Sequence, residues 1–133
     1  MMMDEQQFAN VDQLFAPMKR RHKTATLPVS GNAVRIQSLT EREVSAFQSA
    51  TIAANGTGLK KSRLEDANRR LIVLCLVDGA GNRILNDSHI AKLADWDGAD
   101  TAFLYNECIG HVGLKTEDIE GLVKNSEGTT VVD

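Results

Sequence analysis

The sequence predicts an α+β fold, mainly α, in which one β-hairpin at about residues 24–39 is followed by about five helices in a single compact domain. The length of 133 residues, with 42% hydrophobic and 25% charged residues, suits one domain rather than two. Aromatic residues make up only 5%, so the core must be built from aliphatic side chains, largely on helix faces. The apolar period also changes at Thr40, from that of strands to that of helices.

Residues 1–23 are expected to lie outside this domain, as an N-terminal helix and a basic connector. Pro17 ends the helical pattern, and the run 19–23 is basic enough to stay solvated. Four large apolar residues recur at helical spacing before the proline: Phe8, Val11, Leu14 and Phe15.

The hairpin is predicted from a turn cluster between two apolar segments. Ser30, Gly31 and Asn32 form the cluster, and β-branched residues flank it. Pro28 cannot donate a ladder hydrogen bond, so its strand is expected at the edge of a sheet.

Two capping boxes predict the next two helix starts. Thr40 is followed three residues later by Glu43, and Ser62 by Glu65. The turn residues 55–58 stop the first of these helices. The second carries an apolar stripe to Val77, although its last seven residues alone would equally suit a buried strand.

Turn and cap residues divide the rest of the domain. A sharp turn is expected at 78–82, a short helix capped by Asn86 and closed by Trp96, and then a helix from about Gly98 to His111 that Gly113 ends.

The domain is expected to close at about residue 124. Thr116 caps a last short helix, and residues 125–133 are expected to be a disordered tail. Three apolar residues of this last helix share a face: Ile119, Leu122 and Val123.

Nothing in the sequence indicates a catalytic, cofactor or metal site. His22, His89 and His111 each lack a second ligand at metal spacing. Cys75 and Cys108 lie far apart in apolar segments and are expected to be reduced core residues. Acidic pairs lie at expected helix ends, where capping accounts for them. The chain is therefore expected not to be an enzyme.

Charge is distributed unevenly along the chain. The net charge is −3, but the first 94 residues carry +4 and the remainder −7. This asymmetry favours head-to-tail self-association or the steering of a charged partner. The longest apolar run, 71–77, is far below the ~20 residues of a membrane helix, and no signal peptide is evident. We therefore expect a cytoplasmic protein with no membrane partner.

Two basic segments, 19–23 and 60–70, raise the alternative of a nucleic-acid-binding regulator. Glu65 and Asp66 interrupt the second segment, and no aromatic residue lies among the cations. The sequence pI is about 5.6. A single-strand binding platform needs both aromatic residues and a positive surface. Nucleic acid is therefore not the expected partner.

The order of elements resembles the tail assembly chaperones of siphophages, small proteins encoded just before the tape measure protein. The likeness covers about residues 24–124, including the run Leu76-Val77-Asp78-Gly79-Ala80-Gly81-Asn82-Arg83-Ile84 and the helix end Ile109-Gly110-His111-Val112-Gly113-Leu114. It implies a non-enzymatic protein of the host cell cytoplasm, absent from the mature virion, that binds and solubilises the tape measure protein and recruits tail tube subunits. The family commonly also makes a longer product by ribosomal frameshifting.

A holdase needs amphipathic surface to cover the apolar stripes of its client. The candidate partner-binding residues are those of the two terminal helices: Phe8, Val11, Leu14, Phe15, Ile119, Leu122 and Val123. Packing within the chain is the alternative use of the same residues. A structural tail connector or terminator subunit is the alternative within the phage tail.

Overall fold

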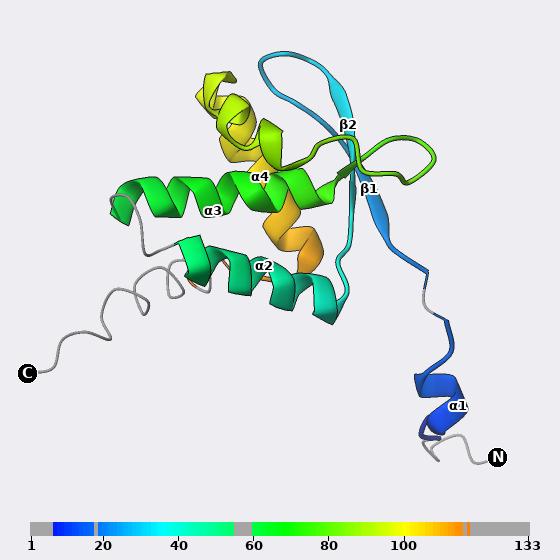
Figure 1. Cartoon of the computed structure of the whole chain (residues 1–133). Helices are drawn as coiled ribbons and strands as arrows, with labels where there is room; N and C mark the ends of the chain where they lie inside the picture. Colours follow the sequence, from blue (N-terminus) through cyan, green and yellow to red (C-terminus); the bar gives the residue numbers. More distant parts are fainter. Residues whose placement is uncertain (1–6, 18, 55–59, 116, 118–133) are drawn as a thin grey trace, which may run out of the picture.

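The computed structural model describes residues 7–17, 19–54, 60–115 and 117. Its α+β class, with a hairpin followed mainly by helices, is the one predicted from the sequence (Figure 1). The elements in chain order are α1 (Val11–Leu14), β1 (His22–Thr26), β2 (Ala33–Gln37), α2 (Glu41–Ala54), α3 (Lys60–Cys75), β3 (Leu76–Val77), the 3₁₀ helices η1 (Asp87–His89) and η2 (Ala91–Asp95), and α4 (Gly98–Val112).

The sheet has three antiparallel strands in the order β1-β2-β3. The predicted hairpin is confirmed, with Thr24 paired to Arg35. β1 lies at the edge of the sheet, as expected, but Pro28 is in the turn rather than in the strand. The strand ends earlier because the N–H of Leu27 already bonds the carbonyl of Asn32 at 2.9 Å and closes the loop.

The third strand is a feature that the sequence left unresolved. α3 continues as a helix to Cys75, and only Leu76 and Val77 are extended. They pair with β2, and Val77 also forms an isolated bridge with Arg83 across the predicted turn at 78–82. Two residues are too short for a periodic signal, so the segment could be predicted only as helix or strand.

The helix starts are partly as predicted. The N–H of Thr40 donates to Glu43 Oε1 at 2.8 Å, and the N–H of Glu43 donates to Thr40 Oγ1 at 3.2 Å, which confirms the first capping box. α3 begins at Lys60 rather than at Ser62. Lys60 and Lys61 favour helix and extend it by two residues. The predicted stop at 55–58 lies outside the described residues.

The segment after the sheet follows the predicted order with one change of geometry. Asn86 caps its helix as expected, but the turn is 3₁₀ and is interrupted at Ile90. Asp97 caps α4, and Gly113 ends it with a φ of +92°, a backbone conformation that a side chain disfavours. Both ends of α4 were therefore predictable from sequence.

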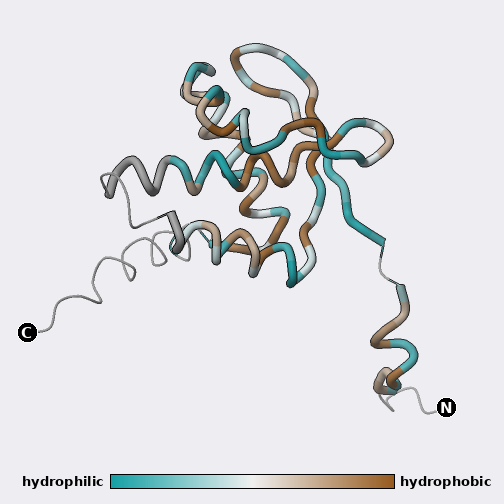
Figure 2. Tube along the Cα trace, viewed as in Figure 1, coloured by the Kyte–Doolittle hydropathy of each residue, from teal (hydrophilic) through white to brown (hydrophobic). Residues whose placement is uncertain are grey.

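The core lies where α3 passes between the sheet, α2 and α4 (Figure 2). α3 supplies the largest share of it, and α4 packs across α3 and against β2. As expected from the low aromatic content, aliphatic side chains dominate. The fully buried side chains of high volume are Phe47, Ile36, Leu71, Ile72, Leu76, Leu104 and Val73, with Thr51, Cys75 and Cys108. Both thiols are buried and free, as predicted.

The basic run before β1 differs from the solvated connector expected of it. Its residues from Arg20 onward bind the domain through β2, α2 and α4. The sequence alone did not indicate these contacts, because acidic side chains and helix-end carbonyls meet the cations only in the folded protein.

Candidate partner-binding site

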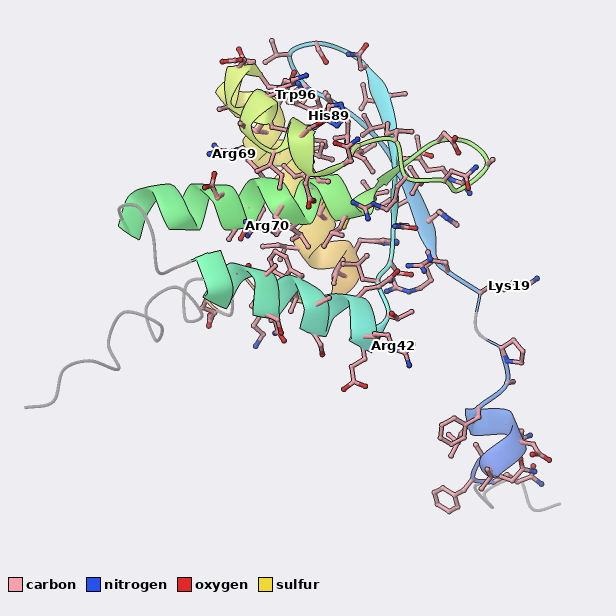
Figure 3. The ribbon with its side chains drawn as sticks, viewed as in Figure 1. Lys19, Arg42, Arg69, Arg70, His89 and Trp96 are labelled. Carbon is pink, nitrogen blue, oxygen red and sulfur yellow. The ribbon has the colours of Figure 1, made fainter. Side chains whose placement is uncertain are left out.

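The most exposed apolar surface belongs to residues 7–17, which we call the N-terminal arm. The arm stands away from the domain, and α1 is its only helical turn (Figures 1 and 3). Within the arm, the helix is confined to Val11–Leu14, whereas the apolar spacing predicted helix from Phe8 to Phe15. Four large side chains are exposed by well over half: Phe8 82%, Val11 69%, Leu14 64% and Phe15 81%.

Local hydrogen bonds rather than packing hold the arm's helical turn. The N–H of Gln13 donates to Asn10 Oδ1 and the N–H of Asn10 donates to Gln13 Oε1, each at 2.9 Å. This reciprocal cap already orders the turn in part. The turn therefore loses less conformational entropy when a partner binds it. A single turn without tertiary support is marginal in water, so burial of its apolar face by another surface would stabilise it.

The arm is joined to the domain at Arg20. The guanidinium donates to Glu43 Oε1 at 2.6 Å, to Glu43 Oε2 at 3.1 Å and to the carbonyl of Ser38 at 2.8 Å. The two-pronged bond to Arg20 lowers the pKa of Glu43 and raises the pKa of Arg20. This contact fixes the direction in which the chain leaves the domain toward the arm.

Arg21 and Lys23 of the basic run are also engaged. Arg21 Nη2 donates to the carbonyl of His111 at 2.9 Å, at the C-terminal end of α4. His111 Nε2 lies 3.1 Å from the carbonyl of Arg21, so each of the two residues contacts the backbone of the other. Lys23 Nζ lies 2.6 Å from Glu107 Oε1. These contacts use the charges within the chain and leave fewer of them for phosphates.

A groove between α2 and the end of α3, which we call the α2–α3 groove, is the second candidate surface. It encloses about 320 Å³. Gln37 Nε2 donates to the carbonyl of Leu74 at 2.8 Å at its floor, and Arg70 reaches across it from α3 toward α2 (Figure 3). Its apolar lining consists of Leu39, Ala46, Phe47, Ala50 and Leu74.

The groove was not predicted from sequence, although one signal pointed to it. Ala46 and Ala50 are four residues apart, so they lie on the same face of α2, and both are exposed. Small apolar residues on an exposed helix face leave room for a side chain of another segment or of another molecule. Their position beside buried Phe47 depends on the packing of α2 against α3, which no local pattern contains.

A smaller hollow of about 270 Å³ lies between α3 and α4. Arg69 Nη2 contacts Asp66 at 2.8 Å at its edge, whereas Arg69 Nε and Asn68 Oδ1 are buried and have no hydrogen-bond partner among the residues that the structure describes. Because protein atoms cover both of these polar atoms, a ligand entering the hollow would not reach them. The hollow is therefore a poor candidate for a ligand site.

Two of the histidines make structural contacts, His111 with Arg21 and His89 with the cap of η1. His89 Nδ1 accepts the N–H of Asn86 and completes the cap of η1. Within the described part of the chain, no group of three or more His, Cys, Asp or Glu residues could hold a metal ion. None of the helices described is long and apolar enough to span a membrane.

The structure describes four of the seven predicted partner-binding residues. Phe8, Val11, Leu14 and Phe15 lie together on the arm and are exposed. The other three residues, Ile119, Leu122 and Val123, lie outside the described residues, as do the cap at Thr116 and the tail 125–133.

No family model, no curated protein and no solved structure matches this chain. The function is therefore inferred from the chain's own surfaces and from the resemblance of its sequence pattern.

Proposed function

We propose that this chain is a tail assembly chaperone, a non-enzymatic protein that binds the tape measure protein and keeps it soluble until the tail tube forms around it. The observation that carries the proposal is the N-terminal arm, where four large apolar side chains are exposed on residues 8–15. A long helical client exposes apolar stripes that drive aggregation. An arm with a matching apolar face covers such a stripe by helix-to-helix packing.

The position of the arm supports binding to another molecule rather than packing within the chain. Its helical turn ends at Leu14, β1 begins at His22, and Arg20 is bonded to the domain between the two. Only a few residues therefore separate the apolar side chains of the arm from the folded domain. A client bound there would be kept beside a charged, soluble domain, as a holdase requires.

The alternative of a nucleic-acid regulator finds less support. Arg20 and Lys23 contact carboxylates, and Arg21 contacts a helix-end carbonyl. Phosphates would have to displace these partners, whereas a nucleic-acid surface presents its cations free. The apolar arm would also have no use in a complex held by counterion release.

Co-expression with a tape measure protein tests the proposal. With the chain present, more of the client should remain in the soluble fraction and co-purify with it. The double variant Phe8→Ser, Phe15→Ser should lose most of this effect. Val29→Ser is the matched control, because Val29 is 57% exposed but lies in the β1–β2 turn. A client that is equally soluble without the chain, or with the arm variant, contradicts the proposal.

Purified phage particles distinguish the chaperone from a structural subunit of the tail. A chaperone is left behind when the tube closes, so mass spectrometry of mature virions should not detect the chain. A stoichiometric amount in the particle would favour a connector or terminator. Recruitment of tail tube subunits, the second activity that we propose, is measured by adding purified tube protein to the client complex.

A further inference from the structure

We propose that the outer edge of β1 binds an extended, acidic segment of a partner protein, which joins the sheet as a further strand. The edge consists of the backbone N–H and carbonyl groups of His22, Thr24 and Thr26, and we call it the β1 edge. It is separate from the N-terminal arm, and binding there does not depend on the chaperone function.

The hydrogen bonds of the hairpin leave the β1 edge free. The N–H of Leu27 donates to the carbonyl of Asn32 at 2.9 Å, and the N–H of Ser38 donates to the carbonyl of Arg21 at 2.8 Å. In an antiparallel pair, residues that bond the neighbouring strand alternate with residues that do not. The odd-numbered residues from Arg21 to Leu27 therefore bond β2, and the even-numbered residues of the β1 edge point their backbone groups away from it.

The β1 edge is also accessible. Its three residues are exposed, and β1 is the outermost strand in the order β1-β2-β3. No hydrogen bond from another described residue reaches their N–H or carbonyl groups. Three donors and three acceptors thus lie in a row at the spacing of an extended chain.

β1 lacks most of the features that keep an edge strand from pairing. Edge strands are usually protected by a proline, a bulge or a charged side chain. The five residues of β1 pair with β2 without a bulge, and Pro28 lies in the turn. The Lys23 ammonium is turned toward α4, where it lies 2.6 Å from Glu107 Oε1. The edge is therefore open to another strand.

The hairpin is positively charged and carries no carboxylate. Residues 13–40 include five Lys or Arg and neither Asp nor Glu. Two of these cations are paired with glutamates of α2 and α4. Arg21 and Arg35 instead donate to backbone carbonyls. Asp78 offsets part of the charge of Arg35, although its carboxylate is held mainly by the backbone N–H of Asn82.

The positive charge is felt at the start of β1. Desolvation lowers the pKa of His22, and so do the charges of three neighbours: Arg35, Arg20 and His111. An acidic residue of an added strand is therefore attracted to the end of the β1 edge at His22.

These properties select the occupant. An extended backbone matches the alternating groups of the β1 edge, whereas a helix uses its backbone groups internally. A second copy of the hairpin has the same excess of cations and no carboxylate to complement them. An acidic, strand-forming segment of another protein satisfies both the backbone groups and the charge.

Amide hydrogen exchange in the full chain without a partner tests whether the edge is open. The amides of His22, Thr24 and Thr26 should exchange rapidly, whereas those of Lys23 and Ala25 should be protected by β2. Protection of all five amides would overturn the proposal. It would assign the edge to a segment of the same chain if it is independent of concentration, and to a second copy if it rises with concentration.

A synthetic peptide, acetyl-Glu-Thr-Val-Thr-Val-Thr-Glu-amide, serves as the partner strand in an NMR titration. It should shift and protect the amides of the β1 edge. The same peptide with Lys in place of both Glu should bind at least about 10-fold more weakly, because attraction becomes repulsion. Proline in place of both Val should abolish binding, because it removes ladder donors. Absence of shifts at the β1 edge, or equal binding of the acidic and the basic peptide, contradicts the proposal.

Thr24→Pro removes an N–H at the centre of the β1 edge that β2 does not use. The domain should stay folded, and the acidic peptide should bind at least about 10-fold more weakly. Thr24→Val is the matched control, because it keeps this N–H and should bind as the wild type does. Unchanged binding by Thr24→Pro would show that the contact is not a strand ladder.

The exchange and titration experiments use the wild type, so they decide the proposal even if the proline unfolds the hairpin. No client and no residue of the arm takes part in them. A closed or unused β1 edge would therefore disprove this interface and leave the proposed function intact.

Discussion

The carboxylate of Asp100, in the first turn of α4, accepts the backbone N–H of Val29 at 2.7 Å in the turn of the β1–β2 hairpin. Its second oxygen accepts the N–H of Ser30 at 3.1 Å, and the residue is only 3% exposed. No pattern in the sequence indicates this bond. One carboxylate thus joins the hairpin to α4 across 71 residues of chain.

Asp100→Ala should destabilise the domain by about 2–3 kcal/mol. The substitution leaves two backbone N–H groups without their acceptor and removes a charged hydrogen-bond acceptor. The free energy of unfolding in urea measures this loss. Asp100→Asn keeps one acceptor oxygen and should cost about half as much.

Asp95→Ala is the control for Asp100, since Asp95 is an exposed carboxylate at the end of η2. Its effect should remain within about 0.5 kcal/mol. Equal losses at the two positions would show that the bonds to the hairpin turn contribute little.

The bond between Arg20 and Glu43 makes part of the stability depend on pH. Arg20 holds the pKa of Glu43 below its ordinary value of 4.5. The folded state therefore keeps this carboxylate charged at a pH where the unfolded chain protonates it. The stabilisation is present above about pH 4.5 and is lost as the pH falls through the lower pKa of the folded state.

Glu43→Gln should consequently cost about 1 kcal/mol at pH 7, a modest value because the pair is partly exposed. The difference from wild type should shrink as the pH falls below 4.5. Urea unfolding at several pH values measures it. Thr51→Val is the contrasting variant, because it removes the hydrogen bond from the Thr51 hydroxyl to the carbonyl of Phe47, which joins two neutral groups, so its cost should be similar at every pH. A Glu43→Gln loss that is also independent of pH would contradict the role given to Arg20.

Neither thiol should react in the folded protein. A hydrogen bond with Cys75, together with burial, raises the pKa of Cys108, and only the thiolate is a good nucleophile. Both cysteines are buried where α3 and α4 pack. Labelling by a disulfide reagent at pH 8 should therefore proceed at the rate at which the protein opens, and urea should accelerate it.

Thr24→Cys supplies the exposed reference for this experiment, because Thr24 lies on the surface of the edge strand β1. The introduced thiol should react at the rate of a free cysteine, with the two native thiols still protected. Rapid labelling of native Cys108 would show that the contact between α3 and α4 opens readily.

The sequence predicted those parts of the fold that depend on local hydrogen bonds. The capping box at Thr40, the cap at Asn86 and the C-terminal Gly113 are each complete within about four residues, so a local pattern identifies them. β3 and the tertiary role of Asp100 arise only from packing between distant segments. The 3₁₀ geometry after Asn86 likewise depends on how Leu93 is buried against the core.

The candidate site, too, could be predicted from the sequence only in part. The apolar residues of the arm were identified from their spacing alone, because an amphipathic segment carries its own signal. The α2–α3 groove was not, since its walls come from β2, α2 and α3 and meet only in the folded chain. The contacts of Arg20 and Lys23 were missed for the same reason, and a run of cations therefore resembled a solvated connector.

The arm should be dispensable for the stability of the domain. A substitution in the arm should then affect binding without changing the free energy of unfolding. Phe15 is almost fully exposed, so Phe15→Ser should change the free energy of unfolding by no more than about 0.5 kcal/mol. Leu71 is fully buried at the centre of α3, and Leu71→Ala should cost about 2–5 kcal/mol, because it removes apolar contacts and leaves a cavity. Both are measured by urea unfolding at a concentration low enough to keep the chain monomeric. If Phe15→Ser destabilises the monomer as much as a core substitution does, the arm packs against its own domain in solution and is not available to a partner.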